Sequence, residues 1–421
     1  MHLLYSALLA LALVLSLPWW LWQMFRSGKY RAGLAERFGR VPEHLRRNDW
    51  PVIWVHAVSV GEVLAVGGLI NRLRDENPNH RVVVSTTTAT GQKLARDRFG
   101  ADNVFFFPLD FAFAIRPYLK ALKPELVVIA ETEFWPNFLR LARKFGAKIC
   151  VVNARISDRS FPRYRRFKAL IQRSLKHIDR FLTQTEIDRG RLIEIGAAPE
   201  RVAVSGNLKF DITPPKIVPL VADLQLAFVR DGVSPVVVAG STVEGEESIL
   251  IDAFRRLLKW NPNATMILAP RHPERWPAVL DLLRASSLPW QQRSAWDRAK
   301  SLAGSIFLLD TIGELAAAYQ LATVAFVGGS LVPRGGHNIL EPANYGVPIV
   351  VGPYTENFRE IVEAFVRAGA VDVVHPDQFA GELLHLLDQI EKREELGMHA
   401  AEVVRKTRGA TDRTLAVLNG F

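Results

Sequence analysis

Residues 328–354 decide the fold; they read Gly328-Gly-Ser-Leu-Val-Pro-Arg-Gly-Gly-His-Asn-Ile-Leu-Glu-Pro-Ala-Asn-Tyr-Gly-Val-Pro-Ile-Val-Val-Gly-Pro-Tyr354. The stretch follows the apolar run 324–327 and ends in a second one, 349–351. A strand, a glycine-rich turn, a short helix and a second strand are the parts from which an α/β fold builds an anion pocket. Glycine lets the backbone approach a ligand closely, and the N–H groups at the start of a helix point toward a phosphate.

Polar side chains within this stretch favour a binding site over a purely structural turn. Asn338 and Glu341 would lie in the first turn of the helix, three residues apart and on neighbouring faces. A carboxylate in that place can accept hydrogen bonds from ribose hydroxyls beside a phosphate. A tight turn between buried strands would explain the glycines but not Arg334 and His337 among them. The stretch therefore predicts a nucleotide or sugar-nucleotide site.

The composition indicates two globular domains and an anionic partner. The 421 residues exceed the roughly 250–300 at which single cores stop growing, and 49% of them are hydrophobic. Cys150 is the only cysteine of the sequence, which excludes a disulfide framework or a thiolate metal cluster within the chain and favours a buried structural thiol. The formal net charge of +10 favours an anionic partner.

Residues 3–25 carry no charged side chain and would form a helix of roughly 30 Å or a little more, enough to cross a bilayer. A cleaved signal peptide is the alternative, but such a peptide begins with positive charge, and this run begins uncharged apart from His2. Tryptophans close the run like an interfacial belt, and basic residues follow it. We predict an uncleaved single-pass anchor over residues 1–25, with the body of the protein in the cytoplasm.

Positive charge gathers in two segments, one after the predicted anchor and one at residues 155–180. The first holds Arg26, Lys29, Arg31, Arg37 and Arg40. In the second, Phe161, Tyr164 and Phe167 interleave with arginine and lysine. Basic and aromatic residues together could bind nucleic acid, but on a tethered chain an anionic membrane surface is the simpler partner, and a solvated helix face is the remaining alternative. We expect no nucleic acid and make no prediction of the oligomeric state.

Short apolar runs alternate with helical stretches along the chain, as expected for strands buried on both faces of parallel sheets. The expected strands of the first half are 52–57, 81–85, 104–107, 126–130, 148–152 and 180–182, and those of the second half are 235–239, 265–269, 306–309, 324–327, 349–351 and 370–374. The proline-rich segment 207–219 reads as a linker between them. The fold class is therefore α/β, with two doubly wound domains, 26–206 and 220–421, facing one another across a cleft. Residues 389–418 look helical and could pack back on the first domain.

The first motif whose side chains could take part in a reaction is His56-Ala-Val-Ser-Val-Gly-Glu62, which spans the end of a predicted strand and the start of a predicted helix. Ser59 can cap the helix, and Glu62 would lie in its first turn at the carboxyl end of the sheet. An acidic residue there also complements the helix dipole, so a structural role is equally compatible. The dipole would lower the pKa of Glu62, and catalysis would then need an apolar wall or close alignment with the substrate.

The second motif, Glu131-Thr-Glu-Phe-Trp-Pro-Asn137, directly follows a strand. Pro136 suits the first turn of a helix, so Glu131 and Glu133 would lie in the preceding loop. Metal ligation is disfavoured, because no Asp-x-Asp sequence or His pair completes a site. Residues 153–158 occupy the equivalent place after the next strand, where they could bind a polar substrate or cap a turn. Lys209, at the mouth of the linker, could reach an anion between domains or be merely solvated.

Further polar loops follow strands of the second half. Residues 240–246 open a helix after a strand and form a candidate anion cradle. Arg271 could contact a phosphate and His272 a base or sugar, and the backbone of residues 310–315 could frame a nucleobase. The sequence contains no Walker A motif and no Gly-x-Gly-x-x-Gly, which argues against ATP hydrolysis and dinucleotide redox chemistry.

Taken together, these motifs resemble the Kdo transferases, the 3-deoxy-D-manno-octulosonic acid transferases of lipopolysaccharide assembly. The resemblance rests on residues 56–62, 131–137, 153–158, 206–211, 270–275, 310–315 and 328–353 and spans nearly the whole chain. It implies a GT-B fold, with acceptor bound to the first Rossmann-like domain and nucleotide donor to the second. It also implies transfer of Kdo from CMP-Kdo to the tetraacylated lipid A precursor at the cytoplasmic face of the inner membrane.

The resemblance assigns roles residue by residue. It implies that Glu62 is the general base and that Glu131, less so Glu133, and Lys209 stabilise the transition state. The implied CMP contacts are Arg271, His272, Ile312, Gly313, Glu314, Asn338, Ile339, Leu340 and Glu341. The implied mechanism is an inverting single displacement. Because CMP leaves with one phosphate, donors such as Arg271 and Lys209 can take up its charge, so we expect neither a metal nor a cofactor, the donor CMP-Kdo being a substrate.

Two other readings remain open. Another membrane-associated GT-B glycosyltransferase or a sugar-nucleotide epimerase has a similar architecture, although an epimerase would need no lipid anchor. A membrane-tethered nucleotide-sensing scaffold is the non-enzymatic alternative. Replacing Glu62 with Gln separates them, because an enzyme would lose turnover while keeping CMP affinity.

Overall fold

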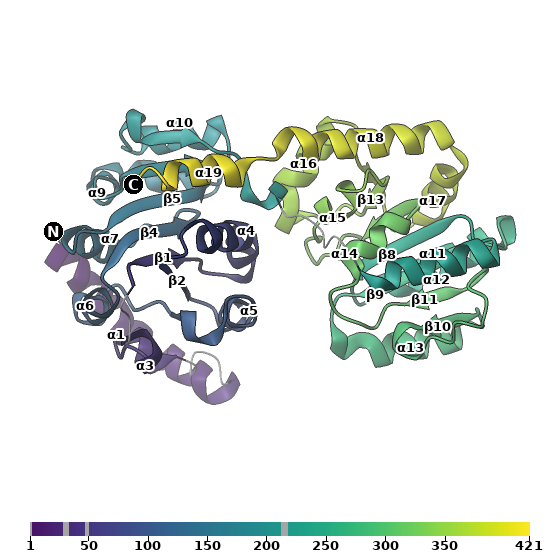
Figure 1. Cartoon of the computed structure of the whole chain (residues 1–421), viewed down its shortest axis with the longest axis horizontal. Coiled ribbons are helices and arrows are strands. Elements are labelled where there is room, and N and C mark those ends of the chain that lie inside the picture. The colour runs from purple at the N-terminus through teal and green to yellow at the C-terminus, as the bar shows by residue number, and fades with distance from the viewer. Residues whose placement is uncertain (1, 28–32, 47–49, 212–217) are drawn as a thin grey trace. The chain divides into compact units, whose positions relative to one another are not determined.

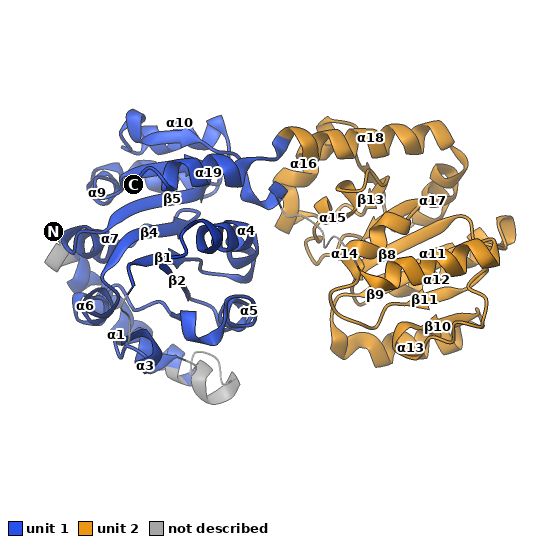
Figure 2. Cartoon of the chain, in the orientation of Figure 1, with its two compact units in different colours: residues 1–212, 407–421 blue, residues 213–406 orange. Residues whose placement is uncertain are grey.

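The computed structural model describes residues 2–27, 33–46, 50–211 and 218–421, and Figure 1 labels their elements. The chain forms two compact units, distinguished by colour in Figure 2. Unit 1 comprises residues 1–212 and 407–421, and unit 2 comprises residues 213–406. Each unit is an α/β domain built on a seven-stranded parallel sheet, so the prediction of two Rossmann-like domains is confirmed.

The sheet of unit 1 has the strand order β3-β2-β1-β4-β5-β6-β7. The strands are β1 (Val52–His56), β2 (Arg81–Thr86), β3 (Val104–Phe106), β4 (Pro124–Ala130), β5 (Lys148–Ala154), β6 (Arg180–Thr183) and β7 (Val202–Val204). The helices are α1 (His2–Ser27), α2 (Leu34–Arg37), α3 (Glu43–Arg46), α4 (Val60–Glu76), α5 (Ala89–Phe99), α6 (Ala112–Leu122), α7 (Pro136–Lys144), α8 (Phe161–Arg166), α9 (Lys168–Leu175), α10 (Glu186–Glu194) and α19 (Ala410–Leu418). Short 3₁₀ turns are η1 (Ala101–Asn103), η2 (Pro199–Arg201) and η3 (Leu208–Asp211).

The sheet of unit 2 has the order β10-β11-β9-β8-β12-β13-β14. The strands are β8 (Val236–Thr242), β9 (Thr265–Pro270), β10 (Trp290–Gln292), β11 (Ile306–Leu308), β12 (Val324–Val327), β13 (Ile349–Val351) and β14 (Asp372–Val373). The helices are α11 (Pro219–Asp231), α12 (Glu246–Trp260), α13 (Trp276–Ala285), α14 (Leu315–Ala318), α15 (Leu340–Ala343), α16 (Arg359–Arg367), α17 (Phe379–Asp388) and α18 (Ile390–Thr407). The 3₁₀ turns are η4 (Pro273–Arg275), η5 (Arg293–Ala295), η6 (Tyr319–Leu321) and η7 (Glu356–Phe358).

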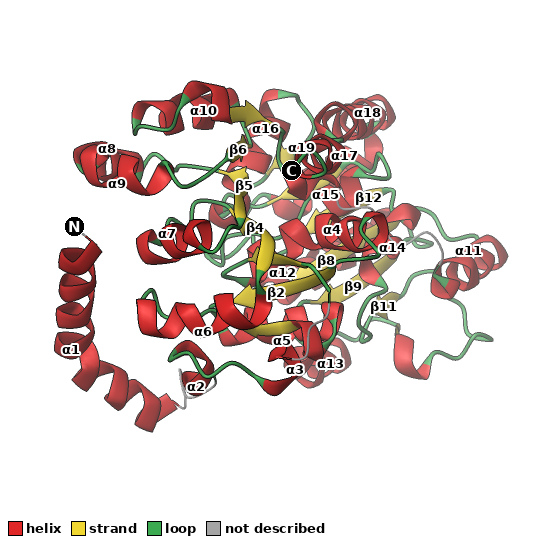
Figure 3. Ribbon diagram, turned by 60° about the vertical axis from the view of Figure 1, so that its left-hand side comes forward, coloured by secondary structure: helices red, strands yellow, loops and turns green. Residues whose placement is uncertain are grey.

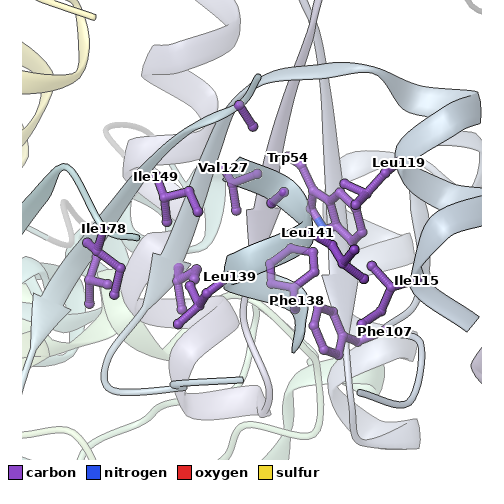
Figure 4. Close-up of a cluster of buried hydrophobic side chains, with 14 of the residues drawn as sticks. Trp54, Phe107, Ile115, Leu119, Val127, Phe138, Leu139, Leu141, Ile149 and Ile178 are labelled. Atoms are coloured by element: carbon purple, nitrogen blue, oxygen red, sulfur yellow. The ribbon is translucent and has the colours of Figure 1, made fainter. Parts of the chain in front are cut away.

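The central strands are apolar throughout because helices cover both faces of each sheet. In β1, Trp54 belongs to the hydrophobic cluster on one face, whereas Ile53 and Val55 belong to the cluster on the other. Trp54 packs against Phe138 of α7 (Figure 4), and their ring centroids are 4.9 Å apart. Cys150 in β5 is fully buried, as predicted. Strands β7 and β10 were not among the expected strands, because neither is a buried apolar run: at most one residue of each is buried.

The end of the chain belongs to unit 1. The predicted carboxy-terminal helix is two helices, α18 and α19, separated at Gly409, which has a left-handed φ of 90°. Asp211 Oδ1 accepts the Gly409 N–H at 2.7 Å, and Arg413 Nε donates to the Ser205 carbonyl at 2.8 Å. Residues 208–211, which we expected in the linker, thus form the turn η3 inside unit 1. The remaining linker residues 212–217 lie outside the described part of the chain.

Helix α1 lies along unit 1, beside α6 and α7 (Figure 3). Asn137 Nδ2 donates to Ser6 Oγ at 3.0 Å, and Leu11, Val14 and Leu15 on α1 are exposed. Among the described residues, no helix reaches the length and apolarity needed to cross a membrane. The transmembrane anchor predicted over residues 1–25 is therefore not supported: the run is helical, but part of its surface packs on the protein. Lys29 and Arg31 of the basic flank lie outside the described residues.

Candidate active site

The loops that carry the predicted carboxylates follow neighbouring strands of unit 1. Strands β1 and β4 pair in parallel, and the chain order of the sheet reverses between them. Open parallel sheets bind ligands beyond the carboxyl ends of their strands at such a switch point. Glu62 follows β1 and Glu131 follows β4, so the topology alone brings these two loops together.

Glu62 lies in the first turn of α4, which Ser59 caps. Ser59 Oγ accepts the Glu62 N–H at 3.5 Å and donates to Glu62 Oε1 at 3.0 Å. Glu62 Oε2 accepts the N–H of Val58 at 2.8 Å. Serine at the cap and glutamate three residues later form a variant of the capping box. The hydrogen bonds from Val58 and from the Ser59 hydroxyl, one to each carboxylate oxygen, fix the orientation of the carboxylate.

Burial raises the pKa of Glu62 to about 7, and the negative charges of Glu131 and Glu133 add to this effect. The hydrogen bonds from Val58 and Ser59 act in the opposite direction without cancelling it. Only 8% of the residue is exposed. The expected lowering of this pKa by the helix dipole is therefore wrong as a net effect, because the loss of hydration is larger. A carboxyl group with a pKa near 7 suits a general base at neutral pH.

Glu131 holds a strained backbone conformation. Its φ is 56°, and Asn153, at the end of the neighbouring strand β5, has a φ of 54°. Non-glycine residues in the left-handed region concentrate at functional sites. Burial and then the charge of Glu131 raise the pKa of Glu133. The three predicted carboxylates are thus close enough to influence one another.

His56, the first residue of the Glu62 motif, belongs to the core. It is fully buried, its Nδ1 lies 2.9 Å from Ser85 Oγ, and its ring stacks on Phe107 at 4.0 Å. Burial lowers its pKa to about 3. The ring therefore stays neutral at physiological pH and is unsuited to exchange a proton there.

Lys209 lies on the ordered turn η3. Its backbone N–H donates to Asn207 Oδ1 at 3.0 Å, and the neighbouring Leu208 N–H donates to Asn153 Oδ1 at 3.0 Å. Asn153 is fully buried, so its side chain connects the end of β5 rigidly to the turn that presents Lys209. The predicted motif 153–158 therefore supports the site through Asn153.

In unit 2, the last residue of the candidate anion cradle at residues 240–246 is Glu246, whose carboxylate accepts backbone N–H groups mainly from the glycine-rich segment after β12. The fully buried Glu246 accepts N–H groups from Gly329 at 2.8 Å and from Ser330 and Leu331 at 2.9 Å each. It also accepts the Val243 N–H at 3.0 Å. Of these four donors only Val243 belongs to residues 240–246, so its N–H is engaged, and the anion cradle expected from the rest of that loop stays a prediction. Glu246 holds the glycine-rich segment after β12 in place.

Arg271 follows β9 and is exposed, and its positive charge reaches the residues of the glycine-rich stretch. It lowers the pKa of Glu341, although burial raises that pKa overall. Burial, then Arg271 and His272, lower the pKa of His337 to about 4. Arg271, His272, His337 and Glu341 therefore form one cluster in unit 2. His337 belongs to this cluster, although it was not among the expected CMP contacts.

The other expected CMP contacts divide into side-chain and backbone groups. Ile312 is 81% exposed, and Gly313 beside it has a φ of 90°. Glu314 is held by Arg293, with Nε and Nη2 at 3.1 and 3.0 Å from its carboxylate. Asn338 Nδ2 lies 3.5 Å from Glu341 Oε1, and its Oδ1 accepts the Leu340 N–H at 3.2 Å.

The side chains of Ile339 and Leu340 are buried, each 1% exposed, so only their backbone groups could meet a ligand. Asn207 and Glu246 lie within motifs that the sequence indicated, but their supporting roles were not predicted, and Arg293 was not singled out at all. The Ser-x-x-Glu spacing before α4 was the available signal for the fixed orientation of Glu62. Within the described residues, no group of three or more His, Cys, Asp or Glu side chains is placed to hold a metal ion.

The two units together match solved enzymes of GT-B type. A glycosyltransferase from Rickettsia africae aligns with a TM-score of 0.53, covering 88% of this chain and 98% of that one at 13% identity. A putative UDP-N-acetylglucosamine 2-epimerase from Listeria monocytogenes aligns with a TM-score of 0.56, covering 88% and 96% at 15% identity. At these identities the likeness establishes the GT-B fold.

Sequence similarity identifies the family. Residues 32–212 match the family model described as 3-deoxy-D-manno-octulosonic-acid transferase (kdotransferase). The 3-deoxy-D-manno-octulosonic acid transferase of Haemophilus influenzae is 34% identical over 404 residues, which cover 94% of this chain and 93% of that protein. The chain therefore belongs to the 3-deoxy-D-manno-octulosonic acid (Kdo) transferase family and is a glycosyltransferase, as its motifs predicted.

Proposed function

We propose that the protein transfers Kdo from CMP-Kdo to the tetraacylated lipid A precursor, with inversion at the anomeric carbon, in lipopolysaccharide synthesis. The observation that carries this proposal is Glu62: a largely buried, fixed carboxylate with a pKa of about 7 at the switch point of unit 1. Such a group can take the proton of a sugar hydroxyl at neutral pH. The family membership supplies the class of sugar transferred.

In the proposed step, the acceptor hydroxyl oxygen forms a bond to the anomeric carbon of Kdo while its proton passes to Glu62. The bond between that carbon and the phosphate oxygen of CMP breaks, and CMP leaves as the anion. Lys209 and Arg271 supply positive charge to the leaving phosphate, and each well-placed donor of this kind contributes about 3–4 kcal/mol. Glu131 stabilises the positive charge that develops on the sugar ring.

The donor belongs to unit 2 in this proposal. Arg271 and the backbone of the glycine-rich stretch would contact the phosphate, and Asn338 and Glu341 the ribose. Ile312 offers an apolar surface to the cytosine. Transfer requires the donor on unit 2 to reach Glu62 on unit 1.

We place the reaction at the cytoplasmic face of the bacterial inner membrane. The exposed apolar residues of α1 and the basic helices α8 and α9 support this placement. Phe167, between the two helices, is 52% exposed, while Phe161 and Tyr164 pack against the core. Helix α1 then attaches the protein through its exposed face.

The test compares wild type with Glu62→Gln, using CMP-Kdo and the lipid precursor and counting added sugars by mass spectrometry. Turnover should fall by roughly 10²–10⁴-fold, the usual contribution of a general base. CMP affinity should stay unchanged, because Glu62 and the proposed CMP contacts belong to different units. Unchanged turnover would refute the role of Glu62, and absence of transfer by wild type would refute the proposed reaction.

A further inference from the structure

A cavity of about 280 Å³ lies between α1 and the loops that follow β2, β3 and β4 in unit 1. Leu9, Leu13 and Trp20 of α1 form one side of it. Phe107, Phe111 and Trp135 form the opposite side. The cavity therefore has aromatic and aliphatic walls contributed by both the amino-terminal helix and the acceptor domain.

The charged groups at the cavity are already engaged within the protein. Arg37 Nη2 donates to the Thr87 carbonyl at 2.5 Å, and its guanidinium lies over the ring of Phe106. Asp110 accepts the N–H groups of Asn137 and Phe138 at 3.1 and 2.7 Å. What the cavity offers to a ligand is consequently apolar contact, which suits a hydrocarbon chain.

Among the described residues, two buried polar atoms of wall residues, Thr87 Oγ1 and Trp135 Nε1, have no hydrogen-bond partner. The hydroxyl of Thr87 is buried, and among the described residues no group forms a hydrogen bond with it. Buried hydroxyls are usually satisfied, so an unpaired one beside a cavity indicates a ligand with an oxygen or nitrogen atom. The hydroxyl, ester or amide group near the head of a fatty acyl chain supplies such an atom.

Two residues of the cavity wall, Thr87 and Trp135, connect the cavity to the loops that hold the carboxylates. The Thr87 N–H donates to the Val58 carbonyl at 3.1 Å, and the Val58 N–H donates to Glu62 Oε2 at 2.8 Å. On the other side, Trp135 lines the cavity and belongs to the same loop after β4 as Glu133, two residues before it. A molecule in the cavity would therefore lie next to the loops that hold the carboxylates.

We propose that this cavity binds one fatty acyl chain of the lipid acceptor, so that α1 forms a wall of the acceptor site. This inference rests on the proposed function, which supplies a lipid as acceptor. A methylene group is about as large as a water molecule, which takes about 30 Å³ in the liquid. A cavity of about 280 Å³ therefore has room for roughly nine such groups. The exposed Leu11 and Leu15 continue the apolar surface on the outer side of α1.

The test fills the cavity from α1. Ala12 lines it, so Ala12→Phe would occupy part of the space. Ala10→Phe is the matched control, because Ala10 is exposed and does not line the cavity. Both variants receive the tetraacylated acceptor and, separately, the same disaccharide with its acyl chains removed. We expect Ala12→Phe to raise KM for the acylated acceptor about tenfold, with KM for CMP-Kdo and turnover of the deacylated acceptor unchanged.

The possible outcomes separate this inference from the proposed function. Transfer by wild type to neither acceptor would refute the function itself. Transfer by wild type, with Ala12→Phe behaving like Ala10→Phe, would overturn the acyl-chain site alone. Equal losses on both acceptors would also overturn it, because they indicate a general structural effect.

A measurement on unmodified protein guards against a variant that does not fold. An acceptor carrying a diazirine on one acyl chain is cross-linked to wild type and the product is mapped by mass spectrometry. Attachment to Leu13, Phe111 or Trp135 supports the site, and attachment confined to other residues overturns it. An excess of phospholipid vesicles that abolishes the cross-link would likewise overturn it, since the cavity would then bind membrane lipid in general.

Discussion

The negative charge of Glu131, at the end of β4, raises the pKa of Glu62, which follows the neighbouring strand β1. Glu131→Gln removes this charge and should lower the pKa of Glu62. Because the base must be deprotonated, kcat/KM rises with pH through this pKa. The acid limb of the kcat/KM profile should therefore move to lower pH in Glu131→Gln. The profile of kcat/KM between pH 5 and 9 measures the shift.

Glu125→Gln is a suitable control for that profile. Glu125 lies at the other end of β4, and its side chain is 65% exposed, so its charge is screened by water. The acid limb of the kcat/KM profile of Glu125→Gln should coincide with that of wild type. An unshifted limb in Glu131→Gln would show that the two carboxylates are not electrostatically coupled.

Glu62→Gln should stabilise the fold at alkaline pH. A folded pKa of about 7 against an ordinary value of 4.5 means that ionisation of Glu62 opposes folding. The penalty is absent below pH 4.5, grows as the pH rises toward 7 and is complete above it, where it amounts to about 3 kcal/mol. Denaturant unfolding at pH 6 and 8 should show a larger gain for the variant at pH 8. A gain that is equal at both values would exclude the titration of Glu62 as its cause.

Much of the fold could be predicted from the sequence because the physical signals are local. Apolar runs without alternation predicted parallel strands buried on both faces, and the strands β1, β8 and β12 were found where expected. Strands β7 and β10 were not predicted, because most of their residues are not buried and they form no apolar run. Helix α1 was predicted from its apolar length alone, which cannot show that one side packs on unit 1.

The positions of the loops that form the candidate site could be predicted from the sequence, but the pKa values of their carboxyl groups could not. Glu62 and Glu131 follow strands, and the parallel topology brings such loops together. The direction of the pKa shift of Glu62 was mispredicted, because burial depends on residues distant in sequence. Glu246 shows the same limit: nothing in residues 240–246 indicates that a later glycine-rich segment supplies the N–H groups that its carboxylate accepts.

Glu246→Gln should weaken donor binding. The amide NH₂ of Gln would face backbone N–H groups that now donate to a carboxylate, so the segment after β12 would lose its fixed position. A buried donor left without an acceptor costs about 1–3 kcal/mol. We expect at least a tenfold weaker CMP affinity by calorimetry and a higher KM for CMP-Kdo, with KM for the acceptor unchanged.

The control for Glu246 lies two residues earlier. Glu244 is in the same loop, but its side chain is 73% exposed, so Glu244→Gln should bind CMP as wild type does. If Glu246→Gln loses stability without any loss of CMP affinity, Glu246 supports the domain but does not position the donor.

Asn153 combines a left-handed backbone with a hydrogen bond that positions the turn carrying Lys209. Asn153→Gly should relieve the backbone strain and remove the side-chain acceptor, whereas Asn153→Ala should remove the acceptor and keep the strain. Strain of this kind costs about 1–2 kcal/mol, so the alanine variant should be the less stable of the two in denaturant unfolding. If the hydrogen bond positions Lys209, both variants should lower kcat to a similar extent despite their different stabilities, and Lys209→Met should add little further loss in either. If kcat instead follows stability from variant to variant, Asn153 acts only on the fold and the turn finds its place without it.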